Sequence, residues 1–492
     1  MATPVLSADL PNGCEGDGAD LADEDGLRYG LPSTSWTSDT TQQFLGVDSS
    51  SPSTIWRLDH FVQDPGYLAY QEELRCLIFN TAQTTASTRE GTPAAVAEAE
   101  TVAGNNTSSH TATILLQGRR VEYLKNYVAQ IAPWLDMFDS SRAFGIQVPV
   151  LAQTSPALLY AILALSARQI ERKEGKTDSF DSLELYQEAI RLLTPLLQAR
   201  DAKVIPICTI LCVMEMMSAS AQDWRKHLEG CAALFDAFGI HGFCGGLSQA
   251  VFWCYARMDL CGALISDGTQ STLVPLTKWL APGADASEAR ALFRATDSTD
   301  MYANYAVYLC SRACDLIAAR TRFLELGEAN GCNSAVFTEQ WLRIWDDLQA
   351  WVEGRPANML PAQTTDAVPF PHMLFVHWAA ISSNQLYHTA CILLLGMMPR
   401  PLSSELRPTG SVGSSTWHAK RVCGISLTNP HQGCLNNAIQ PLWVAGRLLS
   451  HKSEHDLVVK LIRGIEATTG WGASWRIADL ETAWGYKIRK SG

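Results

Sequence analysis

The sequence has no apolar run long enough to cross a membrane. The longest runs, Val204–Met217 and Thr389–Met398, are shorter than the roughly 17 residues that a spanning helix needs. Met1–Gly30 has no basic region followed by an apolar run, and seven acids precede its first base, Arg28. We therefore expect neither a membrane partner nor a signal peptide.

Positive charge is scarce as well. The 492 residues carry 38 Lys and Arg against 50 Asp and Glu, which gives a net charge of -12. Nucleic-acid binding draws much of its affinity from Lys and Arg side chains that neutralise phosphates. We expect no DNA-binding residues in this chain, and no basic nuclear-import run is visible.

Paired cysteines of the metal-binding type are absent. The 14 cysteines include no Cys-x-x-Cys pair and are spread through apolar stretches, where unpaired cysteine behaves as a small hydrophobe. Cys208 with Cys212, and Cys310 with Cys314, are spaced for one helical face, and we interpret both pairs as core. The sequence predicts no metal site and no cofactor.

What is present indicates a large folded body behind an acidic tail. The apolar fraction is 47% and the charged fraction 18%, as in globular proteins. Residues 1–112, rich in Ser, Thr, Asp and Gly, predict a mostly disordered tail or linker with one short helix near 55–80. An activation segment is the alternative for its acidic beginning. Residues 113–489, apolar-periodic segments divided by Gly and Pro, predict an all-α domain.

Individual helices can be placed in this domain. Ser155 and Pro156 are typical of a helix start, and the interior 157–165 is continuously apolar and hence central. A tryptophan-bearing stripe over 335–352 predicts a helix that Gly354 ends. Further helices are expected near 182–199, 204–219, 224–238, 249–265, 301–326, 371–398, 434–450, 454–466 and 474–487.

One short motif has the spacing of a zinc site. Residues 451–455, His-Lys-Ser-Glu-His, match the H-x-x-E-H pattern of one class of zinc peptidases, which needs both histidines on one helical face. Ser453 and Asp456 have capping-box-like spacing, so a helix boundary is expected inside the motif. We interpret the motif as a connection between two helices.

A second motif is a pair of aspartates. Asp346-Asp347 resembles the magnesium-binding motif of all-α isoprenoid enzymes, but Ala350 stands where a third aspartate belongs. Helical geometry places Asp346 opposite the stripe of Trp341 and Trp345, facing solvent. We predict no catalytic residues.

Aromatic residues are the remaining candidates for a site. The 15 tryptophans, with His372, His377 and His388, are side chains that a pocket for a flat or apolar effector would use. Aromatic residues at helical spacing are otherwise core. The ligand-binding residues remain unknown at this point.

Five stretches of the helical region share a pattern of Trp, Pro and Gly within apolar segments. They are 123–139 with the following helix 155–167, then 224–234, 252–259, 387–395, and parts of 423–476. In this order and spacing, over about 115–486, they resemble the fungal-specific transcription factor domain, the helical region that follows the zinc binuclear cluster of many fungal regulators. The residues that match this family pattern, for which we expect mainly structural roles, are Trp134, Asp136, Pro156, Trp224, His227, Gly230, Trp253, Asp259, Pro441, Trp443, Gly446, Trp471, Trp475 and Arg476.

The resemblance implies transcriptional regulation in the nucleus, with other transcription factors or the transcription machinery as partners. It also implies dimerisation or a small-molecule effector. Family members usually begin with six cysteines that wrap two zinc ions, whereas here only Cys14 and Cys76 precede residue 200. We therefore predict a regulatory body that contacts DNA only indirectly or through a segment missing from this sequence. The alternatives are a helical interaction scaffold that pairs with related factors, an all-α metal-dependent enzyme, and a cytoplasmic location.

Overall fold

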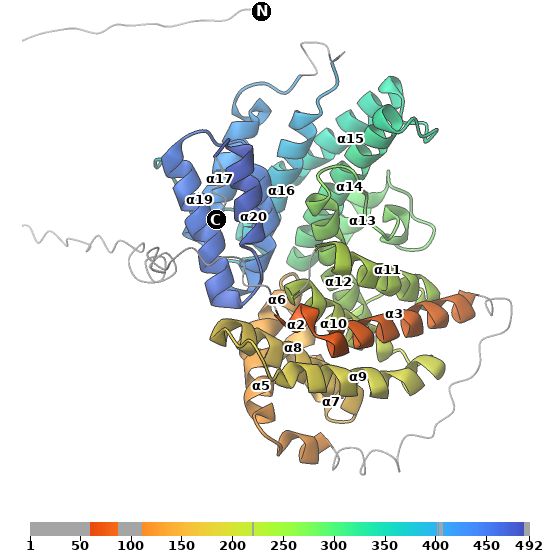
Figure 1. Cartoon of the computed structure of the whole chain (residues 1–492). Helices are drawn as coiled ribbons and strands as arrows, with labels where there is room; N and C mark the ends of the chain where they lie inside the picture. Colours follow the sequence, from red (N-terminus) through yellow and green to blue (C-terminus); the bar gives the residue numbers. More distant parts are fainter. Residues whose placement is uncertain (1–59, 87–110, 219–220, 401, 403–406, 487–492) are drawn as a thin grey trace, which may run out of the picture.

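The computed structural model describes residues 60–86, 111–218, 221–400, 402 and 407–486. Their regular structure is helical apart from one short hairpin (Figure 1), as the apolar periodicity predicts. The N-terminal half of the described chain consists of α2 (His60–Gln63), α3 (Pro65–Ala86), α5 (Arg120–Asn126), η1 (Tyr127–Ile131), α6 (Ala132–Leu135), η2 (Ala143–Gln147), α7 (Val148–Ala152), α8 (Pro156–Glu174), α9 (Asp181–Gln198), α10 (Val204–Ser218), α11 (Ala221–Phe238) and α12 (Gly246–Ile265).

The C-terminal half follows the same plan of helices and short connections. Its elements are η3 (Leu276–Lys278), α13 (Ala289–Ala295), α14 (Thr299–Glu325), α15 (Ser334–Glu353), η4 (Ala357–Met359), β1 (Gln363–Thr365), β2 (His372–Leu374), α16 (Trp378–Gly396), η5 (Ser411–Gly413), α17 (Ser415–Thr428), η6 (Gln432–Cys434), η7 (Asn436–Ala438), α18 (Ile439–Gly446), α19 (Lys452–Thr469) and α20 (Trp475–Ala483).

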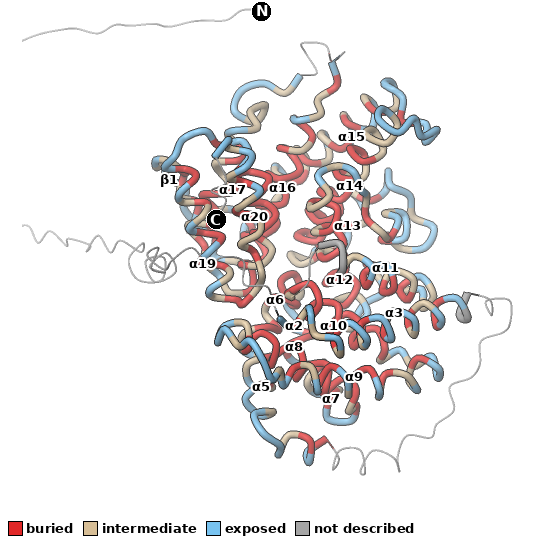
Figure 2. Tube along the Cα trace, in the orientation of Figure 1, coloured by how far each residue is buried: buried red, intermediate tan, exposed pale blue. Residues whose placement is uncertain are grey.

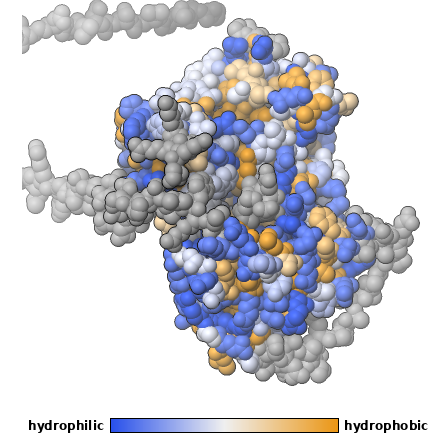
Figure 3. Space-filling view, in the orientation of Figure 1, coloured by the Kyte–Doolittle hydropathy of each residue, from blue (hydrophilic) through white to orange (hydrophobic). Residues whose placement is uncertain are grey.

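The two halves form the lower and upper parts of Figure 1 and meet across α6, α12, α14 and α18. Buried residues line the helix faces that point toward this centre, and exposed residues cover the outer faces (Figure 2). On the face drawn in Figure 3, apolar side chains are scattered among hydrophilic ones. Every described helix is too short or too polar to span a bilayer.

The start of α8 confirms the predicted central helix. Pro156 is its first residue, Ser155 precedes it in an extended conformation, and residues 157–165 are all buried. The Ser155 side chain makes no capping hydrogen bond, so proline rather than the serine hydroxyl defines this start. Gly175, with φ of 66°, ends the helix in the left-handed conformation that glycine adopts without strain.

The tryptophan-bearing helix is also confirmed. α15 ends at Gly354, and its buried stripe includes Trp341, whose indole N–H donates to the carbonyl of Leu394 in α16 at 2.8 Å. Trp345 stacks on Trp341 with ring centroids 5.4 Å apart. The stripe therefore fixes α15 against α16.

The expected helix over 371–398 is wrong in its first turns. Residues 372–374 instead form β2, which pairs antiparallel with β1, and α16 begins only at Trp378. Pro369 and Pro371 lack backbone N–H groups and restrict the residues before them to extended conformations. The side chain of Asn429, directly after α17, then holds the strand by donating to the Met373 carbonyl at 2.7 Å.

Residues 60–86 depart from the predicted tail. Where one short helix is expected, α3 is 22 residues long and packs against α9 and α11. Its buried side chains Tyr67, Leu74 and Ile78 belong to the main core. The remainder of the predicted tail, including its acidic beginning, lies outside the described residues, and the boundary at residue 112 stays a prediction.

Candidate effector cavity

The structure separates the two histidines of the H-x-x-E-H motif. The His451 side chain accepts from the Ser453 backbone N–H and caps α19, with Glu454 completing the capping box. His455 is buried on the first turn, 3.1 Å from the Leu449 carbonyl. The predicted helix boundary inside the motif is confirmed, but His451 and Glu454, not Ser453 and Asp456, form the cap.

The paired aspartates form ion pairs with arginines. Asp346 is exposed, as predicted, and forms an ion pair with Arg290. Asp347 lies 2.6 Å from both Arg290 and Arg312. Positive side chains therefore take the positions that a magnesium ion would need.

The residues of the family pattern are buried or half-buried, except that the side chain of Trp224 lies outside the described residues. Their polar members hold loops in place. Asp136 accepts from the backbone N–H groups of Phe144 and Gly145 at 2.7 and 2.8 Å, and burial raises its pKa to about 7. Asp259 accepts from the backbone N–H groups of Leu273 and Val274, and burial raises its pKa to about 7 as well.

The C-terminal members of this set form one cluster. The Arg476 guanidinium lies 3.8 Å from the ring centroid of Trp443 and 4.1 Å from that of Trp475. It donates to Gln440 Oε1 from Nε at 2.9 Å and from Nη2 at 2.6 Å. Burial lowers the pKa of Arg476 to about 10, so it stays charged at neutral pH. The cluster joins α18 to α20 and orients the Gln440 amide.

A cavity of about 90 Å³ lies beside Gln440, between the two halves of the chain. Its walls are mostly apolar. They include three methionines, which lie just after α6 (Met137), in α10 (Met216) and in α12 (Met258). The lining residues are Trp134, Leu135, Met137, Val213, Met216, Cys254, Arg257, Met258, Leu260, Cys261, Leu264, Leu386, Gly433, Asn436, Asn437, Gln440, Pro441 and Trp471.

Several polar atoms at this cavity have no partner among the described residues. They are the indole nitrogen of Trp134, both amide atoms of Asn436 and the amide nitrogen of Asn437. Buried polar groups in folded proteins are normally hydrogen-bonded, because an unpaired one costs on the order of 1–3 kcal/mol. The residues that carry these atoms all line the cavity, and a mostly apolar cavity with a few polar residues is typical of a ligand site.

Arg257 supplies a positive charge to the same cavity. Its guanidinium donates to the Leu135 carbonyl at 2.6 Å, and among the described residues no carboxylate lies within ion-pair distance of it. Burial lowers the pKa of Arg257 from its usual range. Asp136 and Asp139 act on this charge only from beyond ion-pair distance, so the guanidinium favours a ligand that carries negative charge.

The predicted effector residues are only partly brought together. Trp134 and Trp471 line the cavity, and their rings contact edge to face with centroids 6.2 Å apart. The three histidines lie elsewhere: His377 caps α16, His372 lies on β2, and His388 is buried against His418 with Nδ1 atoms 2.8 Å apart. The apolar periodicity of the sequence could not predict that Asn436 and Asn437 line a cavity, because a polar residue on a short helical turn is usually exposed.

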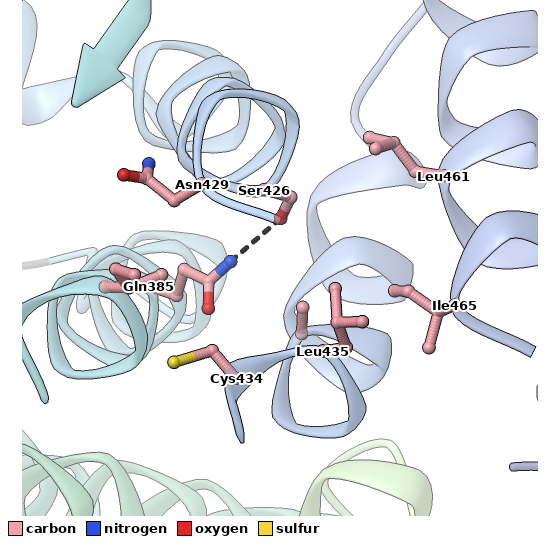
Figure 4. A pocket seen from close by; sticks show the side chains of 9 residues that line it. Gln385, Ser426, Asn429, Cys434, Leu435, Leu461 and Ile465 are labelled. Carbon is pink, nitrogen blue, oxygen red and sulfur yellow. Dashed lines mark hydrogen bonds between the residues drawn. The ribbon is translucent and has the colours of Figure 1, made fainter. Parts of the chain in front are cut away.

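A smaller hole lies next to the cavity, on the other side of η7. Gln385 donates to the Ser426 hydroxyl at 2.8 Å across it (Figure 4), and Leu461 and Ile465 of α19 close one side. Its volume is about 10 Å³, which is room for a single water molecule. The hole is therefore a packing defect and too small for an effector.

Comparison with known proteins assigns the class. The family model for the fungal specific transcription factor domain matches residues 122–484, and the chain belongs to this family of transcriptional regulators. Transcription activator AMTR1 of Alternaria alternata is 23% identical over 479 aligned positions, which cover 71% of this chain and 61% of that protein. The chain thus spans about 61% of the length of this relative. No solved structure matches the chain.

Proposed function

We propose that this helical body regulates transcription in the nucleus in response to a small effector bound in the cavity, and that it catalyses no reaction. Family membership supports the regulatory role. The observation that carries the effector proposal is the set of unpartnered buried polar atoms around the cavity. Other transcription factors or the transcription machinery are the proposed partners.

The cavity defines the chemistry of the effector. Arg257 favours a carboxylate, and the amides of Asn436 and Asn437 with the Trp134 indole add hydrogen bonds around it. The other walls accept a short apolar body. An apolar cavity of about 150 Å³ holds benzene, so the cavity as it stands accepts a smaller molecule or opens through its flexible methionines. We propose a short-chain organic acid.

Binding is tested on the purified full chain by thermal unfolding with a series of short carboxylic acids and their uncharged primary amides. A ligand that binds only the folded state stabilises it by about 2.7 kcal/mol at 100 times its Kd. We expect Tm to rise with at least one acid and not with its amide. The variant Arg257→Met should lose this rise, and Arg290→Met, outside the cavity, should keep it. Unchanged Tm with every acid would reject the effector class.

Regulation is tested separately by fusing the chain to a heterologous DNA-binding domain and measuring a reporter gene. We expect the fusion to change reporter output and a fluorescent fusion to accumulate in the nucleus. A reporter that responds to the chain but not to any acid would retain the regulatory role and remove the effector. A reporter that does not respond at all would contradict the regulatory role.

A further inference from the structure

Two cysteines and a histidine meet between α10 and α11, beside the part of α10 that lines the cavity. Ligand atoms of Cys212, His227 and Cys231 all lie within 4.8 Å of one another. Cys212 and His227 are fully buried and Cys231 is 1% exposed. His227 and Cys231 are four residues apart and so share one face of α11. The sequence alone pairs Cys212 with Cys208 as core and gives no reason to connect either with residues on α11.

The histidine is oriented by a buried carboxylate. His227 Nδ1 lies 2.9 Å from Glu215 Oε1. Glu215 is itself fixed, because it accepts from the Tyr186 hydroxyl at 2.7 Å and from Gln71 Nε2 at 2.9 Å. Metal-ligating histidines commonly have a carboxylate on the nitrogen that does not bind the metal, which sets the ring orientation and the tautomer. The Glu215–His227 pair has this arrangement.

The other side of the ring lies next to the cysteines. His227 Nε2 is buried and makes no hydrogen bond to an oxygen or nitrogen atom of the described residues, and the ring is hydrogen-bonded to the Cys231 thiol. Since Glu215 occupies Nδ1, Nε2 is the nitrogen available to the two thiols. A fully buried imidazole nitrogen beside two cysteine sulfurs is a donor set of the kind that binds zinc.

Electrostatics favour a thiolate at Cys231 alone among the neighbouring thiols. The hydrogen bond from the Cys212 thiol, followed by the His227 ring, lowers the pKa of Cys231 to about 6. Burial raises the pKa of Cys212 and of Cys208, one helical turn before it, and the nearby Cys231 raises both further. Thiolates, not thiols, are the ligands that soft divalent metals prefer.

We propose that Cys212, Cys231 and His227 Nε2 bind one Zn²⁺ ion as its three protein ligands. Tetrahedral zinc has Zn–S distances of about 2.3 Å and Zn–N distances of about 2.0 Å, which place ligand atoms about 3.5–3.8 Å apart. The three ligand atoms therefore need to close in by about 1.3 Å at most, within the reach of side-chain rotation. Binding displaces the remaining thiol protons and the imidazolium proton on Nε2, and Glu215 keeps Nδ1 protonated.

A zinc ion here would tie α10 to α11 and, through Glu215 and Gln71, to α3. Val213 and Met216 on the same helix line the cavity. The zinc site would thus have a structural role in fixing one cavity wall. It concerns a different group of residues from the effector proposal and stands or falls independently of it.

The test is metal analysis of the folded full chain purified without chelators. We expect about one zinc per chain. Replacing zinc by Co²⁺ should give the strong near-ultraviolet absorption of thiolate-to-cobalt charge transfer and the visible bands of a tetrahedral site. A folded wild-type chain that holds neither zinc nor thiolate-bound cobalt overturns the proposal, as does a Cys212–Cys231 disulfide in protein purified under reducing conditions.

Variants identify the ligands. Cys231→Ser and His227→Gln should lose the metal or reduce its affinity by about 10-fold or more. Cys310→Ser is the matched control, because Cys310 and Cys314 are also buried four residues apart but belong to no group of three metal ligands among the described residues. Retention of full zinc and cobalt binding by Cys231→Ser would contradict the assignment. Since the wild-type measurement needs no variant, the proposal is testable even where a substitution prevents folding.

Discussion

The fold requires glycine at position 424 in α17, because a side chain there would have no room. A Cβ atom at this position would collide with the backbone carbonyl oxygen of Pro371, and backbone cannot move aside as a side-chain tip can. We expect Gly424→Ala to lower the free energy of unfolding by about 1–3 kcal/mol. Urea denaturation followed by circular dichroism measures the change.

Gly396, at the end of α16, provides the control for this substitution. It is exposed, and no atom lies within 4 Å of the position that its Cβ would take. Gly396→Ala should therefore be neutral or should stabilise the chain by up to about 1 kcal/mol through helix propensity. Equal destabilisation by both substitutions would mean that the close approach of α17 to Pro371 is not what Gly424 permits.

Asp259 should make stability depend on pH. Its pKa is raised by burial to about 7 in the folded state from a usual value of 3.8, so the folded chain binds more protons than the unfolded chain between these values. Stability from this group is therefore greatest below about pH 4 and falls as pH rises toward 7. Asp136, with its pKa also raised to about 7, acts in the same direction.

The corresponding experiment compares Asp259→Asn with wild type. The amide retains an acceptor for the Leu273 and Val274 backbone N–H groups but does not titrate. We expect the loss of stability between pH 5 and pH 7.5 to be smaller in the variant by on the order of 1 kcal/mol. Differential scanning calorimetry at the two pH values measures it, and parallel pH profiles would show that Asp259 is not the titrating group.

At the scale of secondary-structure elements, α3 has the clearest structural consequence. It precedes the family match, which begins at residue 122, yet Tyr67, Leu74 and Ile78 are buried in the common core. The Ile78 side chain also packs where Gly230 of α11 leaves space. Removing α3 would expose the surfaces of α9 and α11 that it covers, and also the Glu215–His227 pair, which Gln71 of α3 contacts.

Two truncations test this role. A chain that begins at residue 87 should lose at least about 4 kcal/mol of stability, because several large apolar side chains lose their cover. A chain that begins at residue 60 keeps α2 and α3 and serves as the control. Limited proteolysis and thermal unfolding should distinguish the two, and identical Tm values would show that α3 adds nothing to the body.

At the scale of the whole molecule, polar groups at the cavity between the two halves lower the stability of the fold but are available to bind an effector. The amide of Asn436 has no hydrogen-bond partner among the described residues, so Asn436→Leu should raise the free energy of unfolding by about 1 kcal/mol while abolishing any response to an effector. Thermal unfolding and the reporter assay measure the two effects.

Asn429 is the matched control for Asn436. Its amide donates to the carbonyls of Met373 and Ile425 and accepts from the Phe375 N–H, so Asn429→Leu should destabilise the chain by about 1–3 kcal/mol. A loss of stability in both variants would indicate that Asn436 has a structural partner and would weaken the effector proposal.

The sequence by itself determined the helical class, most helix positions and the family. These depend on local patterns: the apolar interior of 157–165, the stripe that carries Trp341, and ordered family stretches that the match over 122–484 confirms. Local sequence patterns predicted helix starts less reliably where prolines favour an extended backbone, as at residues 371–377, or where two side chains could form the cap, as at His451. There the prediction failed by a few residues or by the choice of capping side chain.

Only the tertiary structure decided the cavity and the Cys212–His227–Cys231 cluster. The cavity combines α6, α10, α12 and η7, which lie up to about 300 residues apart in the sequence. Asn436 and the Trp134 indole nitrogen mark it because they have no hydrogen-bond partners within the part of the chain that the structure describes. In the sequence Cys212 reads as core because its helix is apolar, and it is buried in the structure too. Packing of α10 against α11 brings His227 Nε2 beside it, and no local pattern encodes that non-local contact.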